Sequence, residues 1–306
     1  MSSANDFLKK VLSAHNLKND AEEIDKVREE RDNVEKIIKD KYPEAKKTIR
    51  YGGSYAKDTM VKDNYDLDIL CYFHSDETSA GDTLEDIYNN IKDCLKDDYF
   101  VEPKRSALKL KNKDDKNDFH IDVVPGRFVE NGDGDAFLYQ KGAEKDRLKT
   151  NPDKHIDHIK NSGFTNEIKL FKVWKIQNAI ELKTFVLELL VVKVLKGRKD
   201  KTLSDNLKYF WTEMKDNIDN ISIEDPANSN NDLSDIFSSS VKNSIKSVSE
   251  IAINNIENDN WESIFELEDE NSEDKDNSEK KKTIESFASS ASSTGTVAKS
   301  YAERKN

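Results

Sequence analysis

The stretch that decides the fold is residues 52–70, GGSYAKDTMVKDNYDLDIL. Its end, Leu-Asp-Ile-Leu at 67–70, has the apolar residues of a buried strand, yet Asp66 and Asp68 stand there two positions apart. Side chains two apart on a strand point to the same face, so both carboxylates are expected on one side of a sheet. A buried carboxylate is costly unless it is paired or binds a metal ion. The stretch therefore predicts a strand with one wet or cation-bound face.

A third aspartate, Asp122, lies in FHIDVVPGRF (119–128), where alternating apolar residues predict another strand. If the two strands are neighbours, three carboxylates meet and repel one another unless they are protonated or bind cations. Oxygen ligands suit Mg²⁺ or Mn²⁺, and two such ions can activate an attacking hydroxyl and stabilise departing pyrophosphate. We therefore predict Asp66, Asp68 and Asp122 as catalytic residues and as ligands of two Mg²⁺ (or Mn²⁺) ions. For Asp66 and Asp68, simple pairing with lysines at a strand edge stays open.

Gly52, Gly53 and Ser54 follow the predicted strand KKTIRY (46–51) and precede a short predicted helix. Glycine lets the backbone approach a phosphate closely, and a serine at a helix start offers its hydroxyl and backbone N–H groups to an anion. Alone, Gly-Gly-Ser would be an ordinary turn with a serine cap. Because Asp-x-Asp follows after eleven residues, we predict that Gly53 and Ser54 bind a nucleotide.

The second half of the chain is predicted to be helical, with helices at 151–162, 165–179 and 183–197. Lys169 and Lys172 are three apart and share one side of their helix, where they can bind phosphates as point charges. Thr184 can offer a hydroxyl to the same phosphates or cap its helix. Phe185 can face a base or fill the core. The residues alone leave these roles open, and the family resemblance described next implies that all four bind the nucleotide.

Together these motifs resemble the polymerase-β-like nucleotidyltransferase superfamily. Its hallmark is a Gly-Ser turn, Asp-x-Asp and a third Asp, matched by Gly53-Ser54, Asp66-x-Asp68 and Asp122. Further resemblance links the helical half to oligoadenylate synthetases, archaeal-type CCA-adding enzymes and cGAS/DncV-like nucleotidyltransferases, in a segment that grips the donor triphosphate and base. It is carried by Lys172-Val-Trp174, Lys183-Thr184-Phe185 and Glu188. The stretch 225–231, DPANSNN, resembles the Asp-Pro-x-x-x-x-Asn motif of the same group and makes Asp225 a predicted nucleotide-binding residue.

The resemblance implies an α+β fold with a catalytic lobe and a helical lobe. Residues 1–150 would form the nucleotidyltransferase lobe, with a mixed sheet and a long N-terminal helix at 20–41. Residues 151–267 would form the helical lobe that grips the donor nucleotide, with the active site in the cleft between the lobes. Residues 268–306 are charged and Ser-rich, which favours a disordered tail or a loosely packed helix.

The net charge of −12 disfavours a broad surface for RNA or DNA, so tRNA-binding or double-stranded-RNA-binding relatives fit poorly. The resemblance then implies a cGAS/DncV-like enzyme (CD-NTase) of bacterial CBASS antiphage systems. Such an enzyme makes cyclic di- or trinucleotide second messengers from NTPs, ATP among them, and CBASS regulatory or effector proteins are its expected partners. Without a long apolar run or a signal peptide, the chain is expected to be cytoplasmic and away from membranes.

Two alternatives remain open at this point. The chain could add nucleotides to an RNA or protein acceptor, in the manner of oligoadenylate synthetases or CCA-adding enzymes. It could also be a catalytically silent nucleotide-binding module that keeps the fold. Retention of three mutually repelling aspartates argues against the silent module.

Overall fold

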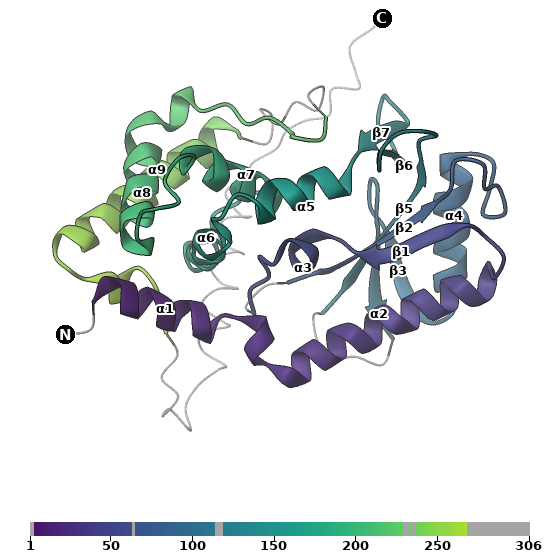
Figure 1. Ribbon diagram of the computed structural model, residues 1–306, viewed down its shortest axis with the longest axis horizontal. Coiled ribbons are helices and arrows are strands. Elements are labelled where there is room, and N and C mark those ends of the chain that lie inside the picture. Colours follow the sequence, from purple (N-terminus) through teal and green to yellow (C-terminus); the bar gives the residue numbers. More distant parts are fainter. Residues whose placement is uncertain (1–2, 63–64, 114–118, 229–232, 234–236, 268–306) are drawn as a thin grey trace, which may run out of the picture. The chain divides into compact units, whose positions relative to one another are not determined.

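The computed structural model describes residues 3–62, 65–113, 119–228, 233 and 237–267, and Met1–Glu266 form one compact unit (Figure 1). The tail predicted at 268–306 lies outside the described residues, as do positions 229–231 of the Asp-Pro stretch. The unit has the predicted α+β character, with a mixed sheet in its first part and helices in its second.

The sheet of the described residues has seven strands in the order β1-β2-β5-β4-β3, and β6 pairs with both β5 and β7. The strands are β1 (Lys47–Tyr51), β2 (Leu67–Phe73), β3 (Tyr99–Pro103), β4 (Leu108–Asn112), β5 (Ile121–Phe128), β6 (Ala136–Tyr139) and β7 (Arg147–Thr150). β2 and β5 run parallel, and every other pair is antiparallel. β3 was not predicted from the sequence. It is an edge strand on which Phe100 and Glu102 are exposed, so it lacks the buried face that makes a strand recognisable.

Nine α-helices and three short 3₁₀-helices are described. They are α1 (Ala4–Ala14), η1 (Leu17–Asn19), α2 (Ala21–Lys41), α3 (Gly53–Lys57), α4 (Leu84–Leu95), α5 (Pro152–Lys160), α6 (Thr165–Gln177), α7 (Thr184–Val194), α8 (Leu203–Asn217), η2 (Ile218–Asn220), α9 (Ser239–Glu257) and η4 (Trp261–Ser263). Asp20 caps the start of α2, since its Oδ1 accepts from the backbone N–H of Glu23 at 3.1 Å. Within the described part of the chain, no helix is both long and apolar enough to cross a membrane.

The two faces of β2 have different surroundings. Its odd-numbered residues, such as Leu67 and Ile69, are buried in a core shared with α2 and α4 (Figure 1). Because side chains alternate along a strand, the even-numbered residues lie on the other face, which carries Asp68 and continues through Leu70 and Tyr72. Helices therefore cover one face of the sheet and leave the carboxylate face for the cavity described below.

The helical half is built around an aromatic cluster. Its members come from α6, α8 and the segment around η4, and they are Phe171, Trp174, Phe210, Trp211, Trp261 and Phe265. The ring of Phe171 packs against both α8 rings, with its centroid 4.0 Å from that of Phe210 and 5.7 Å from that of Trp211. The N-terminal helix α1 contacts α6 and α8 (Figure 1). The start of the chain thus packs on the helical half rather than on the sheet.

Phe171→Ala is expected to lower the free energy of unfolding by about 3–5 kcal/mol, because it removes a fully buried ring and leaves a cavity. The matched control is Phe100→Ala, whose ring is 64% exposed and whose loss should cost about 0.5 kcal/mol or less. Urea unfolding curves of the two variants measure the difference. Equal midpoints would contradict this account of the helical core.

Candidate active site

A cavity of about 390 Å³ lies between the sheet and the helical half. Residues of both contribute to its lining, from the α3 turn and β2 on one side and from α5, α6 and α7 on the other. The predicted site residues that line it are Gly53, Ser54, Asp66, Asp68, Lys172, Thr184 and Phe185. The cleft expected between the two halves is therefore where these motifs meet.

Asp68 and Asp122 lie side by side on the parallel pair β2 and β5, where they are direct register partners. Both side chains point away from the core, as alternation requires. Burial, together with the neighbouring charge of Asp122, raises the pKa of Asp68 to about 7. A bound proton or cation would therefore relieve the repulsion between these two adjacent, partly buried carboxylates.

Asp66 and Asp122 each lie against a nitrogen-bearing side chain. Asp66 Oδ1 lies 2.7 Å from Nε2 of His120, and Lys104 Nζ donates to both carboxylate oxygens of Asp122 at 2.9 and 2.8 Å. Burial acts to raise the pKa of Asp66, but the hydrogen bond and charge of His120 outweigh it and lower the pKa overall. Asp66 is therefore paired with a histidine, while Asp122 has the lysine partner that was considered for the first two aspartates.

The carboxylates suit a hard divalent cation, although the described residues hold no preassembled cluster of three or more His, Cys, Asp or Glu side chains. Asp68 and Asp122 supply adjacent oxygen ligands, which is the donor chemistry that Mg²⁺ and Mn²⁺ prefer. The raised pKa of Asp68 is the physical sign of the fit, because a cation would replace like-charge repulsion with attraction.

Position 53 requires a glycine for steric and conformational reasons. Its φ is +50°, and a Cβ at this position would lie 1.6 Å from Oδ2 of Asp68. No side chain fits in that space, and only glycine adopts this conformation without strain. Backbone pairing ties the same two segments together, since the N–H of Gly52 donates to the carbonyl of Asp68 at 2.8 Å. The Gly-Ser turn and the Asp-x-Asp strand therefore form one unit.

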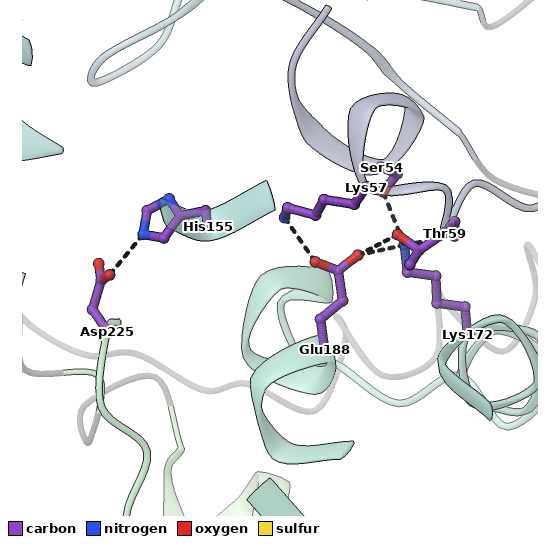
Figure 2. A network of polar contacts seen from close by, with 7 residues as sticks. All are labelled: Ser54, Lys57, Thr59, His155, Lys172, Glu188 and Asp225. Atoms are coloured by element: carbon purple, nitrogen blue, oxygen red, sulfur yellow. Dashed lines mark hydrogen bonds and ion pairs between the residues drawn. The ribbon is translucent and has the colours of Figure 1, made fainter. Parts of the chain in front are cut away.

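Across the cavity lies a buried ionic network centred on Glu188 of α7 (Figure 2). Its carboxylate accepts from Lys57 Nζ at 2.7 Å and from the hydroxyl of Thr59 at 2.7 Å, and it pairs with Lys172 Nζ at 2.7 Å. Burial alone would raise the pKa of Glu188, but the charges of Lys172 and Lys57 lower it to about 2. Lys57 and Thr59 belong to the first half of the chain, so this network joins the two halves. The sequence motifs did not point to either residue.

His155 of α5 is a second cavity residue that sequence reasoning did not select. Its Nε2 lies 2.6 Å from Oδ1 of Asp225, and its ring meets Phe185 edge-on at 4.9 Å (Figure 2). Asp225 does not line the cavity itself, but it contacts His155, which does. The only sequence signal was the pair of histidines three apart in KHIDHI (154–159), which does not distinguish a cavity residue from a surface one.

Lys169 lies apart from the other predicted phosphate contacts. It is 9% exposed, does not line the cavity, and has its Nζ 3.4 Å from Oδ1 of Asp58. Lys172, one turn later on α6, faces the cavity and the Glu188 network. The structure therefore separates two lysines that their spacing places on one side of the helix.

Comparisons with known proteins identify a family and a shared fold. A family model described as "Second Messenger Oligonucleotide or Dinucleotide Synthetase domain" matches residues 1–162, more than half of the chain. A search of curated protein sequences finds no match.

Several solved structures have the same fold. E. coli CdnC, in complex with HORMA-deltaN, has a TM-score of 0.65 at 19% identity, covering 86% of this chain and 98% of the other. Bradyrhizobium diazoefficiens CD-NTase CdnG, in complex with GTP, has a TM-score of 0.65 at 13% identity, with coverages of 82% and 91%. Vibrio cholerae DncV, a cyclic AMP-GMP synthase, has a TM-score of 0.57 at 14% identity, with coverages of 83% and 81%.

Asp68→Asn is expected to stabilise the metal-free protein at pH 8 but not near pH 4. Since the folded-state pKa of Asp68 is raised to about 7, the folded state binds more protons than the unfolded state between about pH 4 and 7, and stability falls as pH rises through that window. Removing this carboxylate should raise the melting temperature at pH 8 by several degrees, at about 2–4 °C per kcal/mol for a chain of this size.

Asp66→Asn is the matched control with the opposite sign. The folded-state pKa of Asp66 is lowered, so its stabilising contribution is present above the ordinary carboxyl pKa and is lost as pH falls through the folded-state value. This variant should melt below the wild type at pH 8. Melting curves in EDTA at the two pH values test both variants, and equal shifts of the same sign would contradict the assignment.

Proposed function

The chain belongs to the second messenger oligonucleotide or dinucleotide synthetase family, and we propose that it joins NTPs, ATP among them, into a cyclic di- or trinucleotide. The observation that carries this proposal is the register of Asp68 with Asp122, directly beside the Gly53-Ser54 turn. Asp68 and the Gly53-Ser54 turn line the same cavity as the cationic side chains of Lys57, Lys172 and Lys175, and Asp122 lies next to Asp68 outside this lining.

In this proposal each residue acts on one part of the donor nucleotide. The triphosphate lies along Gly53, Ser54, Lys172 and Thr184, with its α-phosphorus next to Asp68. Phe185 and His155 form the cavity wall at the base end. An acceptor ribose hydroxyl attacks the α-phosphorus in line, pyrophosphate leaves, and the hydroxyl proton passes to a carboxylate oxygen of Asp122. A second transfer of the same kind closes a dinucleotide ring, and a trinucleotide ring needs a third, each with release of pyrophosphate.

Asp66, Asp68 and Asp122 are the residues proposed to hold two divalent cations, Mg²⁺ or Mn²⁺. Bound there, the cations would supply charge stabilisation for the attacking and leaving oxygens. Lys104 donates to both oxygens of Asp122, and each carboxylate oxygen has a second lone pair with which it could bind a cation. His120 contacts one oxygen of Asp66, Oδ1.

The biological setting proposed is bacterial antiphage signalling of the CBASS type, with a regulatory protein as partner. Support comes from family membership and from the similarity to E. coli CdnC, which was solved in complex with HORMA-deltaN. The net charge of −12 fits a product that is a small anion released from the site, rather than a long nucleic acid held along the surface.

Incubating the purified chain with four labelled NTPs and Mg²⁺ or Mn²⁺ should give a product that phosphatase does not degrade. Asp68→Asn should reduce its formation to background, because the variant loses a carboxylate next to the reacting phosphorus. The matched control is Asp93→Asn on α4, whose side chain is 54% exposed and which should keep full activity.

Different products would contradict the proposal in distinguishable ways. A phosphatase-sensitive linear product would exclude ring closure. Label transferred only to added RNA or protein would indicate a different acceptor. Unchanged activity in Asp68→Asn would overturn the assignment of the site itself.

A further inference from the structure

We propose that Asp58 is a positioning residue for catalysis, which holds the short helix α3 in place through contacts with Lys18 and Lys169. The inference rests on the proposed function, because α3 carries Ser54, which is assigned to the donor triphosphate. It also gives Lys169 a role other than the nucleotide contact expected from the sequence. In this role Lys169 acts through Asp58 and touches no phosphate.

Helix α3 cannot hold its own position. It has five residues, Gly53–Lys57, and isolated helices shorter than about 12 residues are marginal at best in water. Yet α3 supplies Ser54 and Lys57 to the lining of the cavity. Directly after it, the hydroxyl of Thr59 donates to the buried carboxylate of Glu188. Contacts from other elements must therefore fix where α3 lies.

Asp58 forms the turn that ends α3. Its φ is +59°, in the left-handed region, which aspartate and asparagine adopt more readily than most residues. The backbone N–H of Asp58 donates to the carbonyl of Tyr55 at 3.2 Å, and that of Thr59 donates to the carbonyl of Ser54 at 3.0 Å. Asp58→Asn therefore removes the charge at this position while the turn itself remains allowed.

Two lysines from distant segments meet at the carboxylate of Asp58. Lys18 Nζ, from η1, lies 2.7 Å from Oδ1, and Lys169 Nζ, from α6, lies 3.4 Å from the same atom. Burial acts to raise the pKa of Asp58, but the hydrogen bond from Lys18 and the charge of Lys169 outweigh it and lower the pKa overall. The carboxylate is thus charged at neutral pH and links the end of α3 to two other elements.

Lys169 depends on this carboxylate more than Lys18 does. The side chain of Lys18 is 65% exposed, so water can solvate its charge, whereas that of Lys169 is 11% exposed. Within the described part of the chain, Asp58 is the only carboxylate that Lys169 contacts. A largely buried ammonium group that loses its counter-ion is left uncompensated. The pair of Asp58 with Lys169 therefore keeps the end of α3 against α6.

Helix α6 consequently contacts α3 at both ends. Lys172 donates to the hydroxyl oxygen of Ser54 near the start of α3 at 2.9 Å (Figure 2). Lys169, one turn earlier on α6, pairs with Asp58 just past the end of α3 and does not line the cavity. These two contacts set the position of the Gly53-Ser54 turn next to the reacting phosphorus. An error of about 1 Å in such a position can lower a rate by about 100-fold.

The first test measures kcat/KM for product formation from NTPs, at a temperature where circular dichroism shows each variant to be folded. Asp58→Asn and Lys169→Met should each lower kcat/KM by about 10- to 100-fold. Because both changes break the same contact, a double variant should lose no more than the worse single variant. Losses that multiply in the double variant would mean that Lys169 acts on the substrate independently, and would overturn the inference.

Glu35→Gln is the matched control. The side chain of Glu35, on α2, is 12% exposed and also pairs with two cations, Arg31 and Lys39, but it lies outside the cavity. This variant should lose stability and keep the kcat/KM of the wild type. A folded Asp58→Asn that also keeps the kcat/KM of the wild type would overturn the inference and leave the proposed function standing.

Hydrogen–deuterium exchange gives a second readout that does not require the proposed function. Backbone N–H groups in the α3 turn, including those of Asp58 and Thr59, donate within the turn. Peptides covering residues 53–62 should therefore exchange faster in Asp58→Asn and Lys169→Met than in the wild type, and Glu35→Gln should not change them. Unchanged exchange in both variants would overturn the inference. Faster exchange in a protein whose wild type makes no product would support the role of Asp58 in fixing α3 and refute the proposed function.

Discussion

The buried carboxylate of Glu188 is the group on which the geometry of the cavity depends. It is 0% exposed and forms ion pairs with two lysines, Lys57 from α3 and Lys172 from α6. Removing one partner from a buried ion pair costs more than the pair itself contributes, because the remaining charge is left uncompensated. The three helices that supply these side chains are therefore held together. Since α3 follows the Gly-Ser turn directly, Glu188 also sets the position of that turn relative to the helical half.

The opposite wall follows from strand alternation and one steric condition. Leu67 and Ile69 fill the core, so Asp68 must face the cavity. Gly53 then leaves the carboxylate of Asp68 the space that a Cβ would occupy. Lys57 and Lys172 line the same cavity as Asp66 and Asp68, but both lysines pair with Glu188 and neither pairs with these aspartates. The cavity therefore presents both carboxylates and ammonium groups to a polyphosphate and its cations.

The sequence predicts the features that depend on short-range pattern. Alternation placed Asp66 and Asp68 on one face, and the mixed sheet and the helices at 20–41 and 165–179 are confirmed within a residue or two. It could not predict contacts between segments far apart in the chain. Lys57 is paired with a residue 131 positions away, and His155 with one 70 positions away, so their neighbouring residues carry no sign of either role. Helical spacing likewise places Lys169 beside Lys172, whereas tertiary contacts send one to Asp58 and the other to the cavity.

The charge of the chain adds a constraint on what the site can accept. A net charge of −12 repels polyanions at long range, but salt screens such repulsion beyond about 10 Å. Attraction must therefore come from groups within contact distance, and in the cavity these include Lys57, Lys172 and Lys175. A compact triphosphate with its cations can satisfy such local contacts, whereas an extended nucleic acid would gain them at one point and meet acidic surface elsewhere. Local cationic contacts in an acidic chain thus favour mononucleotide donors and a short product.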